Sequence, residues 1–263
     1  AFAQVSLTPE ASLLAEYRFS SAEKGDLPLR FDPENFEEYQ REDTDRQSLR
    51  IGGRYSPNPN NDILGTVIFS RLDGKLQNRI PEYFFSFSFE QEEDGIMGEI
   101  QHLYRSEQFN LISGIGYFHA ETDNVDTFTG IPSITHTSRV DHTNPYVYSH
   151  IRLPVNVTWT LGASMDFYDT QDEDADRDQF NPIMGVIWTL TPATTLRAAA
   201  FRTFKRNLIA DQTLEPTQVA GFNQFYDDGN RTEAWRYGGA IDQSLSHSLF
   251  AGLEYAQRDL DVN

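Results

Sequence analysis

Hydrophobic and polar residues alternate with a period of two along most of this chain. In the first clear segment, the apolar side of the alternation consists of Leu13, Ala15, Tyr17 and Phe19. The alternation recurs near 49–55, 83–89, 159–167, 184–190, 235–241 and 249–255, and more weakly near 62–71, 96–105, 109–119, 144–153 and 194–204. Such alternation places successive side chains on opposite faces of a β-strand. The pattern predicts about twelve strands.

The polar side of these segments indicates which kind of β-protein to expect. It carries charges of both signs and recurrent glycine, which suit a water-filled lumen, and many segments reach the ~9–11 residues that a tilted strand needs to cross a bilayer. A soluble β-sandwich also alternates, but with shorter strands and turns every ~8–12 residues. The sequence therefore predicts an all-β, antiparallel transmembrane β-barrel as a single domain over residues 1–263, with a large soluble sandwich or soluble barrel as the alternative.

Two kinds of connection separate the predicted strands. Short turns are expected at 56–61, 153–156, 191–194 and 245–248. Long polar connections are expected at roughly 20–45, 120–143, 168–180 and 205–231. Outer-membrane barrels have short periplasmic turns and long external loops, so the four long connections are predicted to lie outside the cell. The parity of the connections does not close between 62 and 119, so one strand there is missed or one junction is misread.

Composition supports this interpretation and limits the partners. The 40 acidic and 21 basic residues give a formal net charge of −19, which argues against nucleic acid as a partner. The absence of cysteine excludes disulfides and thiolate metal sites. The 19 Phe, 12 Tyr and 3 Trp suit the aromatic girdles of a barrel. No run approaches the ~18 apolar residues of a membrane helix, so the predicted strands must make any contact with the membrane. Outer-membrane lipid is the partner expected for their apolar face.

The stretch from Leu190 to Arg206 resembles a strand pair from the barrel of TonB-dependent receptors. In that family a similar Leu-Arg-Ala…Phe-Arg strand precedes a loop with Leu-Glu-Pro, found here as Leu214-Glu215-Pro216. The segment Gly-Phe-Asn-Gln-Phe-Tyr-Asp-Asp at 221–228 also resembles barrel regions that follow tetratricopeptide repeats in some outer-membrane proteins.

The resemblance implies passage of a solute or polymer across the outer membrane. It also implies a partial barrel, because a complete receptor barrel has 22 strands, and a plug or periplasmic partner domain that this sequence does not contain. A smaller barrel complete in itself is the alternative.

Charged residues in the lumen-side register are the main candidates for function. They are predicted to line the pore and comprise Glu16, Arg18, Arg50, Arg54, Glu99, Arg105, Asp166, Arg197, Arg236, Asp242 and Glu254. A charged lining selects solutes or holds a plug. The alternative is a set of cross-strand ion pairs that stiffen the barrel. In the 205–231 loop, ligand or partner contact is predicted for Phe222, Asn223, Phe225 and Tyr226.

Two further patterns are interpreted as structural. The aromatic run at 83–89 is predicted to face lipid rather than to form a stacking platform for sugars. The alternate aspartates from Asp172 have the spacing of a calcium loop, but Arg177 and Ile183 stand where Gly and Glu are required, which leaves at most a looser cation site in an external loop.

No enzyme activity, catalytic residue, metal site or cofactor is predicted. Adjacent Asp141 and His142 point to opposite faces of a strand and do not form a relay. The expected function is that of an outer-membrane channel or receptor-type transporter. A structural anchor that displays loops or holds a partner domain is the alternative, and a barrel enzyme is a weaker third.

Overall fold

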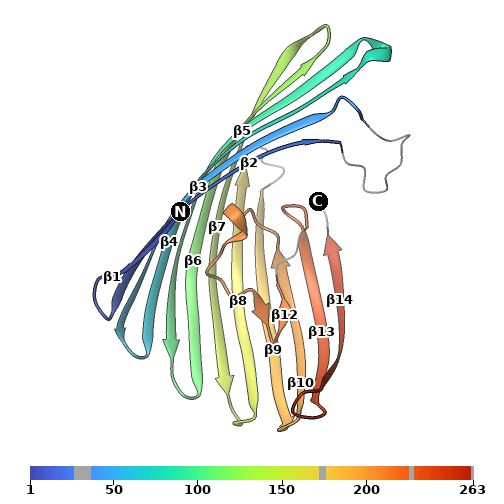
Figure 1. Ribbon diagram of the computed structural model, residues 1–263. Coiled ribbons are helices and arrows are strands. Elements are labelled where there is room, and N and C mark those ends of the chain that lie inside the picture. The colour runs from blue at the N-terminus through green and yellow to red at the C-terminus, as the bar shows by residue number, and fades with distance from the viewer. Residues whose placement is uncertain (27–36, 172–175, 225–227, 262–263) are drawn as a thin grey trace.

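The computed structural model describes residues 1–26, 37–171, 176–224 and 228–261. Within them, twelve strands form one antiparallel sheet in the order β1-β2-β3-β4-β5-β6-β7-β8-β9-β10-β13-β14. The strands are β1 (Phe2–Ser6), β2 (Ala11–Gly25), β3 (Arg41–Asn58), β4 (Asn61–Ile80), β5 (Phe85–Arg105), β6 (Phe109–Phe128), β7 (Ile131–Arg152), β8 (Val157–Thr170), β9 (Arg177–Thr191), β10 (Thr194–Phe204), β13 (Glu233–Ser244) and β14 (Phe250–Asp261). The sheet curls into an open barrel wall, because β1 and β14 do not pair with each other in the described residues (Figure 1).

The number of strands agrees with the prediction, but their make-up differs. Segments 83–89 and 96–105, predicted as two strands, belong to the single strand β5, and β1 was not predicted. The region from Glu90 to Asp94 is polar on both faces, so the hydrophobic alternation disappears there while backbone pairing with β4 and β6 continues. With the two segments merged into one strand, successive connections between residues 62 and 119 lie at alternate ends of the sheet.

The expected long loop over 120–143 is wrong. Strands β6 and β7 continue through this region and meet at a tight turn around Gly130. Polar cross-strand pairs replace apolar ones in this hairpin, as where Thr137 donates to Asp123 over 2.6 Å. The expected connections at 20–45 and 168–180 are shortened in the same way, because β2, β3, β8 and β9 extend into them. The 205–231 connection stays largely free of sheet structure.

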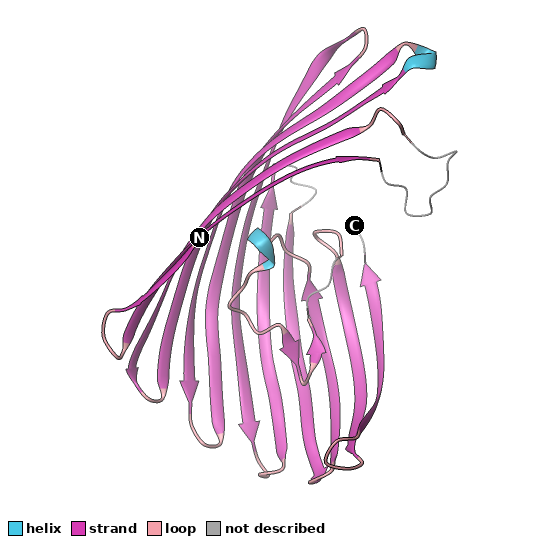
Figure 2. Cartoon of the chain, in the orientation of Figure 1, coloured by secondary structure: helices cyan, strands magenta, loops and turns pink. Residues whose placement is uncertain are grey.

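The two ends of the wall differ in length. Six short connections lie together at one end, shown at the bottom of Figure 1, and the four predicted short turns are among them. At the opposite end the hairpins β4–β5 and β6–β7 project far beyond their neighbours (Figure 2). Strand β5 has 21 residues, or about 70 Å at ~3.3 Å per residue, whereas a bilayer core is ~30 Å thick. Roughly half of this hairpin therefore extends outside a membrane that the lower half crosses.

The projecting hairpins correct the interpretation of the aromatic run. Phe85 and Phe89 pack against Phe128 of β6, with ring centroids 6.4 and 5.7 Å away, and Phe87 packs between them at 6.3 and 5.2 Å. They lie at the end of β5 farthest from the short turns, above the part of the strand that a bilayer would cover. By the period of two along unbroken β5, they also share the face of Met97 and Glu99 rather than the outer face. The rings are therefore not lipid-facing.

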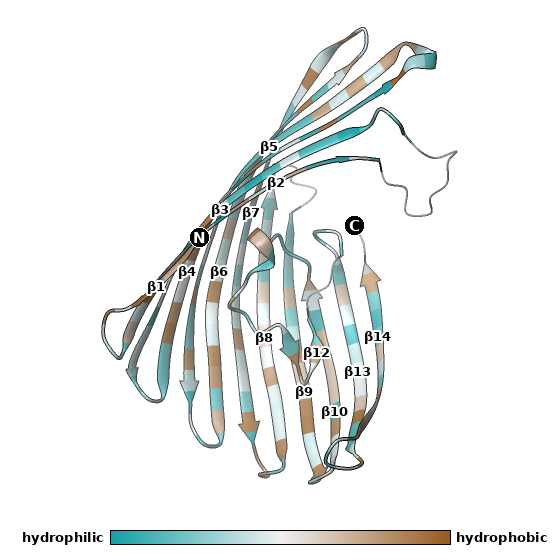
Figure 3. Cartoon of the chain, in the orientation of Figure 1, coloured by the Kyte–Doolittle hydropathy of each residue, from teal (hydrophilic) through white to brown (hydrophobic). Residues whose placement is uncertain are grey.

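The outer face of the lower wall is apolar and open. Large side chains on alternate positions are exposed there, among them Met184 at 55%, Leu161 at 41% and Trp235 at 37%. Figure 3 shows this alternation as bands along the strands. An exposed apolar band of this kind is stable against lipid and unstable in water. In the described part of the chain, no helix is long and apolar enough to span a membrane.

The described part of the 205–231 connection, residues 205–224 and 228–231, folds back onto the concave face and forms buried clusters with it. It contains the short 3-10 turn η4 (Ile209–Asp211) and the strand pair β11 (Gln218–Val219) and β12 (Phe222–Asn223), in front of β7 to β10 in Figure 1. Val219 and Phe222 are 0% and 1% exposed within a cluster that includes Tyr148 and Phe201. We call residues 205–231 the inward loop.

Candidate functional site: the inner wall and the inward loop

The predicted pore-lining residues lie on the concave face, where they form separate groups. At the short-turn end, Asp62 accepts hydrogen bonds from Arg54 over 2.8–2.9 Å and from Arg105. Asp62 lies next to the turn, outside the membrane-crossing part of β4. Hydrogen bonds from Ser56 and from both arginines hold the pKa of this buried carboxyl well below its usual range, so it stays charged. Sequence reasoning missed Asp62, which is the second residue of β4, directly after the Pro-Asn turn.

A second group lies on β2 and β3, where Arg50 is four residues from Arg54 of the first group on the same strand. Glu16 forms ion pairs with Arg18 and Arg50, each over 2.9 Å. Arg50 also donates to the side-chain oxygen of Gln212 in the inward loop over 2.7 Å. These charges therefore connect the wall to the loop, and each of the two groups contains two arginines and one carboxylate.

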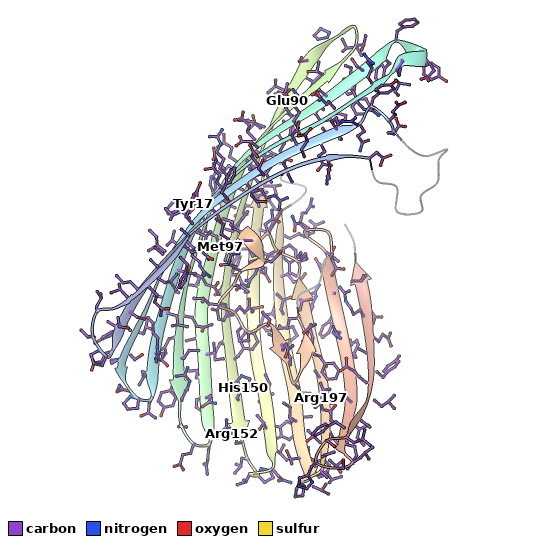
Figure 4. All side chains as sticks on the ribbon, in the orientation of Figure 1. Tyr17, Glu90, Met97, His150, Arg152 and Arg197 are labelled. Carbon is purple, nitrogen blue, oxygen red and sulfur yellow. The ribbon has the colours of Figure 1, made fainter. Side chains whose placement is uncertain are left out.

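A third group lies on β10, β13 and β14 and holds the aromatic end of the inward loop. Arg197 contacts Asp242 over 2.7 Å and Glu254 over 3.4 Å. The guanidinium carbons of Arg197 and Arg236 lie 5.3 and 5.9 Å from the centre of the Phe222 ring. These distances fit cation–π contacts on the same ring. Figure 4 labels Arg197 near the lower end of this part of the wall.

Glu99 holds the middle of the inward loop. Its carboxylate accepts backbone N–H groups of Leu214 and Glu215 over 2.7 and 2.9 Å, and the Tyr146 hydroxyl over 2.8 Å. A carboxylate buried under a loop and bonded to its backbone fixes the position of that loop. The neighbouring Met97, labelled in Figure 4, belongs to a buried cluster with Ile209 of η4.

Arg206 and Glu215 form a buried ion pair within the loop, 2.6 Å apart, with side chains 6% and 4% exposed. The Tyr148 hydroxyl donates to Glu215 over 2.6 Å, and Arg206 donates to the side-chain oxygen of Asn144. Burial raises the pKa of the Glu215 carboxyl, against the opposing effects of Arg206 and Tyr148. We call Glu99, Tyr146, Tyr148, Arg206 and Glu215 the loop latch. Of its five members, pattern analysis identified Glu99, and the Leu-Glu-Pro motif marked Glu215.

Asp166 anchors a buried polar network beside the latch. It accepts hydrogen bonds from Asn144 over 3.1 Å and Asn181 over 2.5 Å, and its carboxylate lies 2.8 Å from His142 Nε2. Asp141 points to the other face, where it contacts Tyr117 over 2.7 Å. The opposite orientation of Asp141 and His142 is therefore as predicted.

Of the four predicted ligand-contact residues of the loop, the structure describes Phe222, which is buried, and Asn223, which is exposed. Phe222 is buried against the wall, and its burial leaves no ring face for a ligand. Its ring contacts Arg197, Arg236 and the residues of the apolar cluster instead. The backbone oxygen of Asn223 accepts a hydrogen bond from Arg236 over 3.2 Å, and its side-chain oxygen accepts one from Gln218 over 2.9 Å. Phe225 and Tyr226 lie outside the described residues.

Gly238 on β13 gives the Phe222 ring its space. A Cβ on Gly238 would lie 2.5 Å from the ring, whereas a Cβ on Gly239, on the opposite face, would have no atom within 4 Å. We expect Gly238→Ala to displace Phe222 and to make the inward loop more sensitive to trypsin, and Gly239→Ala to leave it unchanged. Limited proteolysis of the two variants checks this. Equal protection of the loop in both would contradict the packing described.

No metal centre is evident in the described residues, where no three His, Asp or Glu side chains come together. Residues 172–175 of the alternating aspartates lie outside the described ranges. The groups that the inner wall and the inward loop offer to a solute are charges, hydroxyls and amides.

Solved structures with this architecture are outer-membrane receptors and transporters. The alcaligin receptor FauA from Bordetella pertussis matches 99% of this chain with a TM-score of 0.63 at 14% identity. The ferric citrate transporter FecA matches 98% with a TM-score of 0.71 at 13% identity, and the copper transporter OprC 98% with 0.72 at 11%. The chain spans 42–44% of the length of these three proteins. None of the curated protein sequences matches it.

The sequence also matches the family described as TonB dependent receptor-like, beta-barrel, over residues 10–263. The chain belongs to this family. It is an outer-membrane β-barrel protein, as its alternation and the resemblance of its Leu-Glu-Pro loop predicted. The open wall is that of a partial barrel.

Proposed function

We propose that this protein moves a solute or polymer across the outer membrane, as a channel or receptor-type transporter whose passage the inward loop narrows. The observation that carries the proposal is the difference between the two faces of the wall. The outer face is apolar and exposed, while the inner face holds the eleven predicted charged residues and a loop attached by hydrogen bonds to Glu99 and Arg50. A wall built in this way separates lipid from an aqueous lumen.

The wall charges fit two roles at once. Glu99 and Arg197 are engaged with the inward loop, so their main role is to position it. Arg50 and Arg54 keep side-chain exposures of 29% and 57% despite their ion pairs. We therefore propose that Arg50 and Arg54 line the passage, where their charge acts on ions in the lumen.

Single-channel recording from the full-length protein in a planar bilayer tests the proposal. We expect salt-dependent conductance whose anion selectivity falls in the Arg50→Gln, Arg54→Gln double variant, because two positive charges leave the lumen wall. Arg71→Gln is the matched control, since Arg71 pairs with Asp73 and Glu92 on the exposed upper hairpin. Insertion without any conductance, before and after removal of the inward loop, would contradict transport.

A structural anchor is the second candidate. It is favoured by the two buried clusters that the inward loop makes with the wall, because a filled lumen displays loops without passing solute. Surface display of the projecting hairpins in a protein that never conducts is the result expected for an anchor. A plug or periplasmic partner domain is the further partner that we propose, with Arg54 and Arg105 at the short-turn end as its contacts.

A further inference from the structure

A cavity of about 300 Å³ lies between the inner wall and the tip of the inward loop. Its floor is the point where β3 carries Gly52 on the concave face, and loop residues 212–214 cover it. Gly52 pairs with Leu14 on β2 and with Thr66 on β4, and the Leu14 side chain lies 3.2 Å from the position that a Cβ on Gly52 would take, so Leu14 borders the cavity at this point. The volume is at the lower end of the range for small-molecule sites.

Two arginines border this cavity on the same strand. Arg50 and Arg54 stand two residues to either side of Gly52, so all three share the concave face. Each arginine belongs to a group in which two guanidinium groups share one carboxylate, Glu16 in the first and Asp62 in the second. Each group therefore keeps one positive charge, in a protein whose formal net charge is −19.

One of these guanidinium groups has hydrogen-bonding capacity to spare. Nε of Arg50 is buried and has no hydrogen-bond partner in the described residues, although both terminal nitrogens are bonded. A buried polar atom without a partner is costly and uncommon. Glu99, in the same cross-strand row as Gly52 and Thr66, does not compete for it because its carboxylate is bonded to the loop.

The remaining lining combines polar residues (Gln4, Ser12, Thr66, Gln212 and Thr213) with a group of aliphatic side chains, which a lumen containing only water does not require. Leu14 and Leu64 flank the cavity, and Ile68 and Met97 close it on the side of η4, where they pack with Ile209. Positive groups at the border and aliphatic groups inside complement a ligand with an anionic head and an apolar body.

We infer that this cavity binds a small organic anion, such as a monocarboxylate with an aliphatic chain. The head lies between Arg50 and Arg54 and the chain against Leu14 and Leu64. The inference rests on the proposed transport function and deepens it by naming a class of solute. Because Gln212 binds Arg50 and covers the cavity, ligand binding and loop docking are coupled.

Isothermal titration of the full-length protein in lipid nanodiscs with hexanoate tests the site. We expect saturable binding of hexanoate, at least about tenfold weaker binding of 1-hexanol and of acetate, and none of hexylamine. Arg50→Gln and Arg54→Gln are each expected to weaken hexanoate binding about tenfold or more, equivalent to about 1.4 kcal/mol. Leu64→Ala should weaken hexanoate and leave acetate unchanged. Arg71→Gln and empty nanodiscs are the controls.

Several outcomes would overturn the inference. They are no saturable binding of hexanoate, equal binding of hexanoate and hexanol, or binding that survives replacement of both arginines in a folded protein. Conductance of the same preparation separates this from the broader proposal. A conducting protein that fails to bind hexanoate refutes the site alone, whereas a protein that binds hexanoate and never conducts refutes transport and keeps the site.

Discussion

Glu215→Ala is expected to release the inward loop and to raise single-channel conductance. The substitution leaves Arg206 buried without its carboxylate, and breaking a buried ion pair on one side costs about 3–5 kcal/mol. A cost of this size shifts the ratio of docked to released loop by about a hundredfold or more. The released loop no longer covers the wall in front of β7 to β10 (Figure 1), so the passage widens.

Replacing both partners is the matched control for this prediction. Arg206→Met with Glu215→Leu removes both buried charges together, and such a change is often neutral or stabilising. We expect the double variant to keep the loop docked and the conductance low. Trypsin cleavage at Lys205 and Arg231 reports release independently of current. High conductance in the double variant and none in Glu215→Ala would show that the pair does not hold the loop.

Val67→Arg is expected to lower the free energy of unfolding by about 2–4 kcal/mol, because a charge on the lipid face near the midplane is costly. Val67 is 37% exposed on the outer face of β4, about half-way along the part that crosses the bilayer. The adjacent Thr66 faces the lumen, between Gly52 on β3 and Glu99 on β5. Thr66→Arg is therefore expected to be tolerated, since its charge reaches water and a carboxylate.

Urea unfolding of both variants in lipid bilayers measures this difference. The pair is matched in residue type introduced, in strand and in depth, so that only the face differs. An equal loss for both variants would indicate strand disruption rather than lipid exposure. A larger loss for Thr66→Arg would reverse the assignment of the two faces, and with it the assignment of the lumen.

The sequence by itself determined the class of fold and the inner register. Alternation with a period of two is a local property, because lipid on one side and water on the other act on each strand separately. This is why Glu16, Arg50, Glu99 and Arg236 were placed on the correct face. The short turns at 153–156 and 191–194 were also predictable, because Pro154, Asn156 and Pro192 act through local backbone geometry.

The same local rule failed where both faces of a strand meet water. In the upper parts of β5, β6 and β7 no environment imposes alternation, so the sequence there resembles a loop although the backbone stays paired. Phe85, Phe87 and Phe89 kept the alternation but lie above the membrane, a position that depends on the length of an unbroken 21-residue strand. Their partner Phe128 comes from another strand, and no local pattern connects the two.

Only the tertiary structure decided what the charged residues do. The hydrogen bond from Tyr148 to Glu215, the hydrogen bonds from the loop backbone to Glu99 and the cavity above Gly52 join β7, β5 and β3 to a loop more than 100 residues further along the chain than Glu99. Such contacts arise when a long connection folds back onto a curved wall, and the free energy that favours them comes from burial and pairing across the lumen. Strand periodicity carries no information about that choice, so the latch and the cavity could be found only in three dimensions.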